Sequence, residues 1–332
     1  MDTLNRTLSV APMMDCTDRH CRAFMRMLAP GALLYSEMVT SAALIHGDSE
    51  RFLRHAGDEP CALQLGGSQP ADLANCARLA EDAGYQEVNL NCGCPSDRVQ
   101  QGGIGACLMA EPALVAECYT AMAEATTLPV TIKSRIGIDD HDSYAFFTAF
   151  IEPLYNAGCR VFAVHARKAI LKGLSPRENR EIPPLHYDFV YRVRADFPDA
   201  TFVLNGGLKS KSEVESVMPK VDGVMLGRAV YQSPLLLAEL DEALNGSAPL
   251  DINAFLAESR DYLAAGLEEG TALKHMARHL LGLFAGWPGA RAFRRTLSEG
   301  MNREGATLAV FDDALAQVRG LANLPSQAGI AV

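Results

Sequence analysis

Residues 201–207 read TFVLNGG and residues 222–228 read DGVMLGR. Each is a short run of apolar and β-branched residues that ends in glycine beside a polar side chain, and a segment with helical spacing separates the two. Such alternation is typical of the strand–helix units of a parallel sheet. Six similar runs come earlier in the chain. The predicted strands are Thr7–Pro12, Ala32–Met38, Cys61–Leu65, Glu87–Asn91, Pro129–Arg135, Arg160–His165, Thr201–Asn205 and Asp222–Leu226.

Amphipathic segments between these runs predict the helices that connect the strands. They are Pro70–Ala83, Glu111–Ala125, Tyr144–Ala157, Asp188–Asp196 and Ser212–Met218. Eight strands that alternate with helices predict an α/β fold, a closed (β/α)8 TIM barrel. A doubly wound nucleotide-binding sheet would need Gly-x-Gly-x-x-Gly after its first strand, whereas residues 11–15 read APMMD. The sequence therefore favours the barrel.

A purely helical pattern follows the last predicted strand. Residues 245–249, NGSAP, have the composition of a linker. Three stretches with helical periodicity come after it, Asp251–Glu269, Ala272–Phe284 and Gly289–Glu299. We therefore predict two domains, a catalytic barrel over residues 1–244 and a small C-terminal helical domain over residues 245–332.

The composition is that of an acidic globular protein. Hydrophobic residues make up 48% of the 332 residues, and the formal net charge is −10 with a pI near 5.3. Nonspecific nucleic-acid binding depends on many Lys and Arg residues, so any RNA binding must use local basic patches. All nine cysteines occur at or before Cys159 without a regular spacing, which predicts reduced thiols. Without a signal peptide or a membrane-spanning apolar run, we expect a cytoplasmic protein.

The ends of the last two predicted strands place glycines and a guanidinium where TIM barrels commonly bind phosphate. The residues are Asn205, Gly206, Gly207, Gly227 and Arg228. Bare backbone amides and an arginine suit a phosphorylated cofactor. Alternatively, the glycines serve only tight turns between strands and helices. Because both strands carry such residues, we favour a cofactor phosphate.

Two cations, Lys133 and Arg135, lie two residues apart on the fifth predicted strand and therefore point to the same side of the sheet. A buried cation without a partner is costly. We expect either an anionic ligand or an internal carboxylate such as Glu37 beside them. His165 ends the sixth strand next to further basic residues, which favours a ligand-binding role over that of a core histidine.

Residues 91–96, NCGCPS, lead from a strand into a loop with two thiols. Cys94 is the candidate general acid, since a thiol with an ordinary pKa of about 8.5 is mostly protonated at neutral pH. Cys92 is expected to be structural. A metal site built from Cys92, Cys94 and Cys107 would lack the usual ligand spacing and a nearby histidine, so we predict no metal.

With these motifs in place, the chain resembles the tRNA-dihydrouridine synthases over nearly its whole length. The resemblance rests on residues 11–13 (APM), 64–67 (QLGG), 90–95 (LNCGCP), 102–106 (GGIGA), 133–135 (KSR), 164–167 (VHAR), 205–207 (NGG) and 227–228 (GR). The segment from residue 165 to residue 185 further resembles the bacterial A-type subfamily, whose members modify positions 20 and 20a of the tRNA D-loop.

The resemblance implies a flavin-dependent reduction of uridine to 5,6-dihydrouridine. NADPH would reduce FMN, the flavin N5 would pass a hydride to C6 of uracil, and Cys94 would protonate C5. The uridine would be turned out of the tRNA, and Asn91, Lys133 and Arg135 would stabilise the charge that develops on the base. The residues implied to bind FMN are Pro12, Met13, Met14, Gln64, Lys133, His165, Asn205, Gly206, Gly207, Gly227 and Arg228.

Basic residues in two segments are candidates for tRNA binding. They are Arg167, Lys168, Arg177 and Arg180 after the sixth predicted strand, and Arg291, Arg294 and Arg295 in the helical tail. The alternative for each cluster is an ordinary solvated surface. Barrel geometry places the first cluster at the active-site mouth, so RNA binding is favoured there. No protein partner is implied, and we expect a monomer.

Two other functions are compatible with parts of the sequence. A flavin-dependent barrel that acts on a free small molecule, such as a dihydroorotate or dihydropyrimidine oxidoreductase, would share the phosphate site, but the helical tail and the basic loop argue against it. A non-enzymatic RNA-binding protein or chaperone would explain the basic clusters and would leave Cys94 and the glycine pairs without a role. The sequence therefore favours a tRNA-modifying enzyme.

Overall fold

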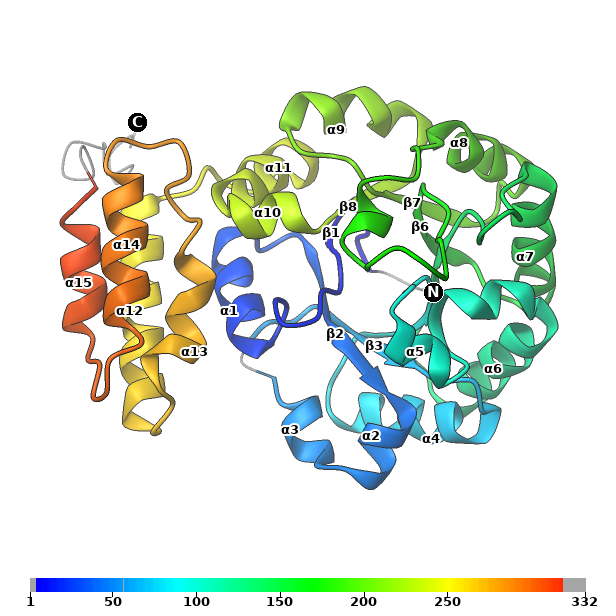
Figure 1. Cartoon of the computed structure of the whole chain (residues 1–332), viewed down its shortest axis with the longest axis horizontal. Helices are drawn as coiled ribbons and strands as arrows, with labels where there is room; N and C mark the ends of the chain where they lie inside the picture. Colours follow the sequence, from blue (N-terminus) through cyan, green and yellow to red (C-terminus); the bar gives the residue numbers. More distant parts are fainter. Residues whose placement is uncertain (1–3, 56, 319–332) are drawn as a thin grey trace, which may run out of the picture.

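The structure is a computed structural model that describes residues 4–55 and 57–318. Its strands are β1 (Leu8–Val10), β2 (Leu33–Thr40), β3 (Cys61–Gly66), β4 (Glu87–Cys92), β5 (Val130–Arg135), β6 (Val161–His165), β7 (Thr201–Asn205) and β8 (Gly223–Leu226). They form one closed parallel barrel in the order of the sequence, in which β1 pairs with both β2 and β8 (Figure 1). The predicted TIM barrel is confirmed.

Helices cover the outside of the barrel. They are α1 (Arg19–Leu28), α2 (Ser41–His46), α3 (Ser49–Leu53), α4 (Pro70–Asp82), α5 (Asp97–Gln101), α6 (Pro112–Ala125), α7 (Tyr144–Asn156), α8 (Tyr187–Asp196), α9 (Lys211–Val217), α10 (Arg228–Gln232) and α11 (Leu235–Asn245), with 3-10 turns η1 (Gly105–Ala110), η2 (Glu178–Arg180) and η3 (Met218–Lys220). Local sequence sets their starts. Pro70 begins α4, where its missing N–H is not needed, and Ser143 caps α7 by accepting from the Phe146 N–H at 3.1 Å.

Alternation along the strands separates a polar lumen from an apolar outer layer. On β4, Val88 and Leu90 point outward and join the large hydrophobic core beneath the helices. The alternate residues Glu87, Asn89 and Asn91 are also buried, yet they are polar and point into the barrel. The lumen therefore contains buried polar side chains as well as apolar ones.

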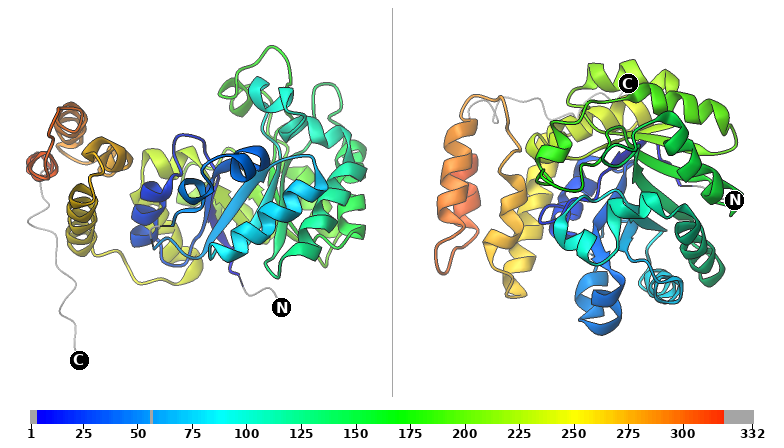
Figure 2. Two further views of the ribbon diagram at one scale, coloured as in Figure 1. Left: turned by 90° about the horizontal axis from the view of Figure 1, so that it is seen from below. Right: turned by 45° about the vertical axis from the view of Figure 1, so that its right-hand side comes forward.

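The chain after α11 forms a helical tail beside the barrel. Its elements are α12 (Ile252–Glu268), α13 (Leu273–Ala277), η4 (Arg278–Leu280), α14 (Ala290–Gly300) and α15 (Ala309–Leu315). Figures 1 and 2 show the tail next to α1, and a second hydrophobic cluster joins Phe24 and Leu28 of α1 to tail residues such as Phe255 and Leu280. The predicted boundary between residues 244 and 245 falls at the end of α11, and the division into two domains stays a prediction.

Two details of the helices differ from the prediction. The predicted helix Ala272–Phe284 is broken into α13, η4 and turns, because the chain there passes close to the end of α10, where a Cβ on Gly282 would clash with the Gln232 carbonyl. Helices α1, α2, α3, α5, α10 and α15 had no prediction, and all of them except the ten-residue α1 are five to seven residues long. Segments of five to seven residues are too short to establish a helical periodicity.

Candidate active site

The carboxyl ends of neighbouring strands bring four predicted site residues to one mouth of the barrel. Lys133 and Arg135 come from β5, His165 from β6 and Asn205 from β7. In the strand register, Arg135 lies beside His165 and His165 lies beside Asn205. The Lys133 Nζ donates to Oδ1 of Asn205 at 3.1 Å. Strand pairing therefore assembles residues that are far apart in the sequence into one polar cluster.

This cluster carries positive charge that no carboxylate balances. Burial and the nearby Arg135 guanidinium lower the pKa of Lys133 to about 7, and burial with the charge of Arg180 lowers the pKa of Arg135 to about 9. Burial and the same cations hold the pKa of His165 well below its usual range. Within the described part of the chain, no carboxylate, Glu37 included, lies within ion-pair distance of Lys133 or Arg135. The cluster suits an anionic ligand.

Arg135 also ties together the two loops that flank the mouth. Its guanidinium donates to the carbonyl oxygens of Gly93 at 3.2 Å, Lys168 at 3.2 Å and Asn179 at 2.8 Å. Asn179 is fully buried and bonds to the backbone of Ile170 in both directions, at 2.7 and 2.9 Å. Arg135 therefore has a structural role, and its predicted contact with a base stays a prediction.

The loop after β4 presents Cys94 on a firmly held backbone. Oδ1 of Asn91 accepts hydrogen bonds from the N–H groups of Gly93 at 3.0 Å and Cys94 at 2.9 Å, and the Cys94 carbonyl accepts from Ala106 at 2.9 Å. Gly105 has a φ of 81°, and a Cβ there would lie 2.6 Å from the Cys94 carbonyl oxygen, so glycine is required. The partly exposed Cys94 is thus held in a defined position.

The other cysteine of this motif has a different environment. Cys92 is fully buried, and burial raises the pKa of its thiol well above the ordinary value. It packs in the large hydrophobic core beneath the helices. Buried thiols of this kind are chemically inert. Cys92 therefore has the features of a structural residue, in contrast to Cys94.

The loops after β7 and β8 lie at the predicted phosphate position. Gly206 and Gly207 have φ values of 107° and 80°, and within the described residues their N–H groups donate no hydrogen bond. A Cβ on Gly206 would clash with the ring of His165, so packing also requires glycine. Arg228 is 43% exposed and donates from Nη1 to Oε1 of Glu181 at 2.6 Å. This corner offers two N–H groups and a guanidinium, and phosphate binding there stays a prediction.

The turn after β1 forms an ordered rim on the same side of the mouth. The Met13 N–H donates to the Thr17 hydroxyl at 3.0 Å, and the Met13 carbonyl accepts from the Thr17 N–H at 3.0 Å. A Cβ on Gly227 would lie 3.1 Å from the Met13 sulfur, so the two loops are in close contact. Met14 is 56% exposed, and Pro12 is partly exposed. Pro12, Met13 and Met14 give the start of this turn an apolar surface, unlike the cations across the mouth.

Gln64 lies deeper in the lumen than the other predicted cofactor ligands. It is 1% exposed. Its Nε2 donates to Oδ1 of Asn89 at 2.8 Å, and its Oε1 accepts from Nδ2 of Asn91 at 2.8 Å. Both ends of the amide are therefore engaged within the protein, and its predicted contact with a cofactor stays a prediction.

The basic residues after β6 fall into two groups. Arg167 donates to a backbone carbonyl, and the Lys168 Nζ pairs with Asp142 at 2.7 Å, so both are engaged within the protein. Arg177 forms only a loose 3.7 Å ion pair with Glu181 and has 81% of its side chain exposed, and Arg180 is exposed as well. The charge of Arg180 lowers the pKa values of the buried mouth cations, which places it near them. The second group is the better placed for an external anion.

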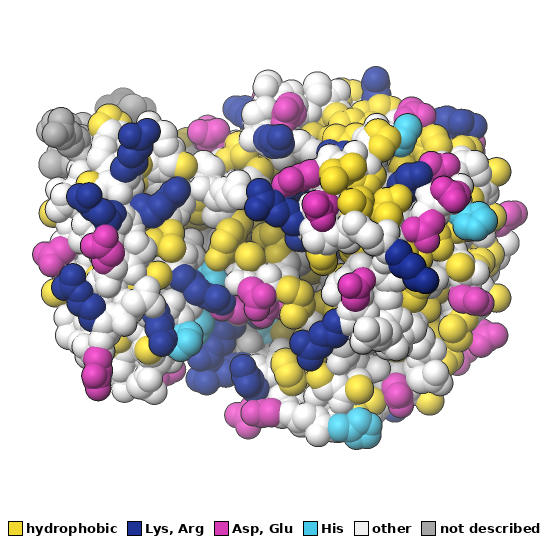
Figure 3. Space-filling model, viewed as in Figure 1, with side chains coloured by type: hydrophobic (Ala, Val, Ile, Leu, Met, Phe, Trp, Pro, Cys, Tyr) yellow, Lys and Arg dark blue, Asp and Glu magenta, His cyan; other side chains and the backbone are white. Residues whose placement is uncertain are grey.

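The tail arginines lie on an exposed face. Arg291, Arg294 and Arg295 all belong to α14, and Arg294 donates from Nε to the Leu281 carbonyl at 3.1 Å. Figure 3 shows Lys and Arg side chains gathered along the hollow between the tail and the barrel, on the face that carries the mouth. On this face, Lys and Arg side chains therefore line the hollow next to the candidate site.

Comparison with known proteins places the chain among enzymes of one family. Residues 9–319 match the family model described as Dihydrouridine synthase (Dus). The chain belongs to the dihydrouridine synthase family. A relative from Pseudomonas putida, the tRNA-dihydrouridine(20/20a) synthase, is 57% identical over 319 residues, which is 95% of each chain. The protein of the same name from Vibrio cholerae is 53% identical over 314 residues, which is 94% of this chain and 96% of that protein.

Solved structures similar to this dihydrouridine synthase family member share its fold. Morphinone reductase aligns with a TM-score of 0.51 and 15% identity over 75% of this chain and 88% of its own. A 2-naphthoyl-CoA reductase complex aligns with a TM-score of 0.55 and 9% identity over 71% of this chain and half (50%) of its own. At such low identity the similarity supports the barrel alone. No helix among the described residues of this family member is both long and apolar enough to cross a membrane.

Sequence reasoning missed several residues that organise the site of this family member. Asn179 anchors the loop that Arg135 contacts, and Glu87, Asn89 and Thr131 link the lumen to the Cys94 loop. One signal for the latter was present, because polar residues at positions 87, 89 and 91 alternate on a strand that is otherwise apolar. Asn179 lies in the segment 165–185 on which the resemblance to the A-type subfamily rests, but that pattern does not indicate its contacts.

Proposed function

We propose that the protein reduces uridine to 5,6-dihydrouridine in the D-loop of cytoplasmic tRNA, at positions 20 and 20a, with FMN as cofactor and NADPH as reductant. The names of relatives more than half identical over nearly the whole chain support this substrate. The single structural observation that carries the proposal is the mouth itself, where the half-buried Lys133 and the buried Arg135, both without a carboxylate partner among the described residues, lie in one cluster with neutral His165 and beside the loop of Cys94.

The residues at the mouth fit a flavin mononucleotide. The N–H groups of Gly206 and Gly207 and the guanidinium of Arg228 would hold the phosphate, since free backbone amides and arginine favour such an anion. Lys133 would face the polar edge of the ring, and Met13 its apolar side. When bound and reduced, the flavin supplies the hydride for C6 of the base.

Cys94 would donate the proton to C5 of the uracil. Its backbone is held by Asn91 on one side and by Ala106 on the other, so the thiol has a defined starting position. Negative charge develops on the base during reduction, and the nearby ammonium of Lys133 stabilises it most strongly in a site that excludes water. A base in folded tRNA reaches this mouth only when it is turned out of its stack.

Binding of tRNA would use local positive charge rather than the total charge of the protein. Arg177 and Arg180 would contact phosphates near the mouth, and Arg291, Arg294 and Arg295 would contact a more distant part of the tRNA. Arg167 and Lys168 are less suited, because each is partly buried and has a close partner within the protein, whereas the ion pair of the exposed Arg177 with Glu181 is 3.7 Å long. We propose that one monomer binds one tRNA.

Two assays test this function. The purified protein should show flavin absorbance and should oxidise NADPH when unmodified tRNA is added, but not when free uridine is added. Turnover of the free nucleoside at the rate of tRNA would instead favour an enzyme of small-molecule metabolism. Mapping of dihydrouridine in tRNA from a deletion strain should show its loss at positions 20 and 20a, and an unchanged map would contradict the proposal.

A further inference from the structure

A chain of hydrogen-bonded side chains runs through the barrel lumen away from the Cys94 loop. The backbone N–H of Cys94 donates to Oδ1 of Asn91 at 2.9 Å. Nδ2 of Asn91 donates to Oε1 of Gln64 at 2.8 Å, and Nε2 of Gln64 donates to Oδ1 of Asn89 at 2.8 Å. Three buried amides therefore connect in sequence, each donating to the next.

This chain of hydrogen bonds ends on the buried carboxylate of Glu87. Nδ2 of Asn89 donates to the Thr131 hydroxyl at 2.8 Å, and this hydroxyl donates to Oε1 of Glu87 at 2.7 Å. The Tyr35 hydroxyl also donates to Oε1 at 2.5 Å, while Arg6 contacts Oε2 at 2.7 and 2.8 Å. Glu87 is fully buried, and these donors satisfy both of its oxygens.

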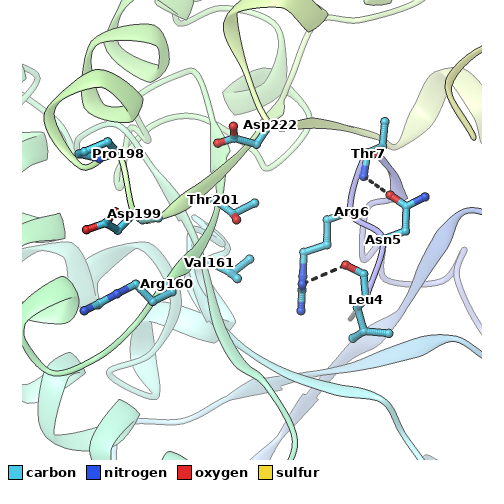
Figure 4. Close-up of a pocket in the computed structure, with 11 residues that line it drawn as sticks. Leu4, Asn5, Arg6, Thr7, Arg160, Val161, Pro198, Asp199, Thr201 and Asp222 are labelled. Carbon is cyan, nitrogen blue, oxygen red and sulfur yellow. Dashed lines mark hydrogen bonds between the residues drawn. The ribbon is translucent and has the colours of Figure 1, made fainter. Parts of the chain in front are cut away.

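Glu87 lies toward the end of the barrel opposite the mouth. Its partner Arg6 lines a cavity of about 440 Å³ at that end, together with Asn5 and Thr7, and Figure 4 shows the Arg6 side chain reaching the Leu4 carbonyl. The residues on β4 that belong to the chain, positions 87, 89 and 91, lie on successive inward-facing positions of one strand. The chain of hydrogen bonds therefore extends along the lumen from the mouth of the barrel toward its opposite end.

The two ends of this chain of hydrogen bonds, the Cys94 N–H group and the Glu87 carboxylate, have fixed roles as donor and acceptor. A backbone N–H can only donate, and an ionised carboxylate can only accept. Each amide between them must therefore turn its oxygen toward Cys94 and its NH2 group toward Glu87. A reversed amide would place donor against donor or acceptor against acceptor at its two contacts. The carboxylate at the other end thus favours, through Thr131 and the other two amides, the same orientation of Asn91 that the N–H groups of Gly93 and Cys94 require.

We infer that Glu87 is a positioning residue that holds Cys94 in place through Thr131 and the three amides. This inference rests on the proposed function, in which Cys94 protonates the base. Proton delivery requires hydrogen-bond distance and alignment, and a misplacement of about 1 Å can lower a rate about 100-fold. The chain of hydrogen bonds transfers no proton itself. It specifies where the thiol lies.

Thr131 is the best position at which to test this role. Replacing Glu87 would remove the carboxylate that the buried Arg6 guanidinium faces and would endanger folding. Thr131→Val removes only the hydroxyl, keeps nearly the same shape and changes no charge. Thr131→Ser keeps a hydroxyl on a smaller side chain. If the valine variant does not fold, Thr131→Ala also removes the hydroxyl.

The two half-reactions are measured separately on the flavin-loaded enzyme. In Thr131→Val, flavin content and flavin reduction by NADPH should stay within about twofold of wild type, while reoxidation by tRNA should slow by about tenfold or more at saturating tRNA. Thr131→Ser should recover most of that rate. Ser9→Ala is the control, because Ser9 is another buried hydroxyl and has no hydrogen-bond partner among the described residues, so its loss should leave both half-reactions unchanged.

Cys94→Ala, measured alongside, separates this inference from the proposed function. If Cys94→Ala is slow and Thr131→Val reoxidises at the wild-type rate, the positioning role is overturned and the acid role stands. If Cys94→Ala itself reoxidises normally, both are wrong. Equal losses in the two half-reactions, or failure of the serine variant to recover, would indicate a general structural role for Thr131 and would also overturn the inference.

Discussion

Replacing Lys133 by methionine should stabilise the ligand-free protein while it disables the enzyme. The pKa of Lys133 lies at about 7 instead of 10.5, and its one hydrogen-bond partner among the described residues is the neutral Oδ1 of Asn205. At about 1.4 kcal/mol per pKa unit, keeping this ammonium charged costs about 5 kcal/mol of folding free energy below about pH 7. Methionine fills similar space without that cost.

The gain in stability should depend on pH in one direction. Below about pH 7 the folded and the unfolded chain both hold the Lys133 proton, so the cost is complete. Between about pH 7 and pH 10.5 only the unfolded chain binds it, and the cost therefore falls as the pH rises. The advantage of Lys133→Met should be largest near pH 6 and small near pH 10.

Urea unfolding of dialysed protein between pH 6 and pH 10 measures this difference. Lys168→Met is the matched control, because the ion pair of Lys168 with Asp142 lies at the surface and should contribute less than about 1 kcal/mol. Reduction of tRNA by Lys133→Met should fall by about 100-fold, the usual effect of losing one charge-stabilising donor. An unchanged stability at pH 6, or an advantage that grows with pH, would refute the electrostatic reasoning.

Three further predictions concern the remaining site residues. Cys94→Ala should keep its flavin but reduce tRNA about 100-fold more slowly or worse in single-turnover assays, whereas Cys92→Ala should be mild; equal defects would contradict the assignment of the acid. Arg228→Ala should lose FMN during gel filtration, and full flavin absorbance would exclude a phosphate contact. Combined Arg177→Ala and Arg180→Ala should raise the Km for tRNA and lower the slope of log affinity against log salt by somewhat under about one unit per contact; an unaltered slope would move the tRNA site to the tail.

The strands were predictable because each is a short buried run bounded by turn residues. β7 was predicted residue for residue, and the other strands begin and end within two residues of the prediction. The helices of the tail were harder to predict than the strands. The periodicity of residues 272–284 suits a helix, but contact between Gly282 and the end of α10 depends on the packing of distant segments. Local pattern carries no information on such contacts.

The site was predictable as a set of residues but not as a set of contacts. Strand alternation was enough to place Lys133 and Arg135 on one side. Whether a carboxylate lay beside them could be decided only in the folded structure, which shows none within reach in its described residues. Similarly, a run of basic residues does not reveal that Lys168 forms a close 2.7 Å ion pair with Asp142, while Arg177 lies 3.7 Å from Glu181 and is 81% exposed.

The closure of the barrel by β1 and β8 has a consequence for synthesis of the chain. β1 is three residues long and its partner β8 ends at residue 226, so the sheet keeps an open edge until more than two hundred further residues have been made. At about 5–20 residues per second, that interval lasts roughly 10–40 s on the ribosome. An unpaired edge is a template for wrong pairing. A nascent chain of this enzyme is therefore exposed to aggregation for most of its synthesis. Closure of its barrel requires that β8 has been synthesised and pairs with β1.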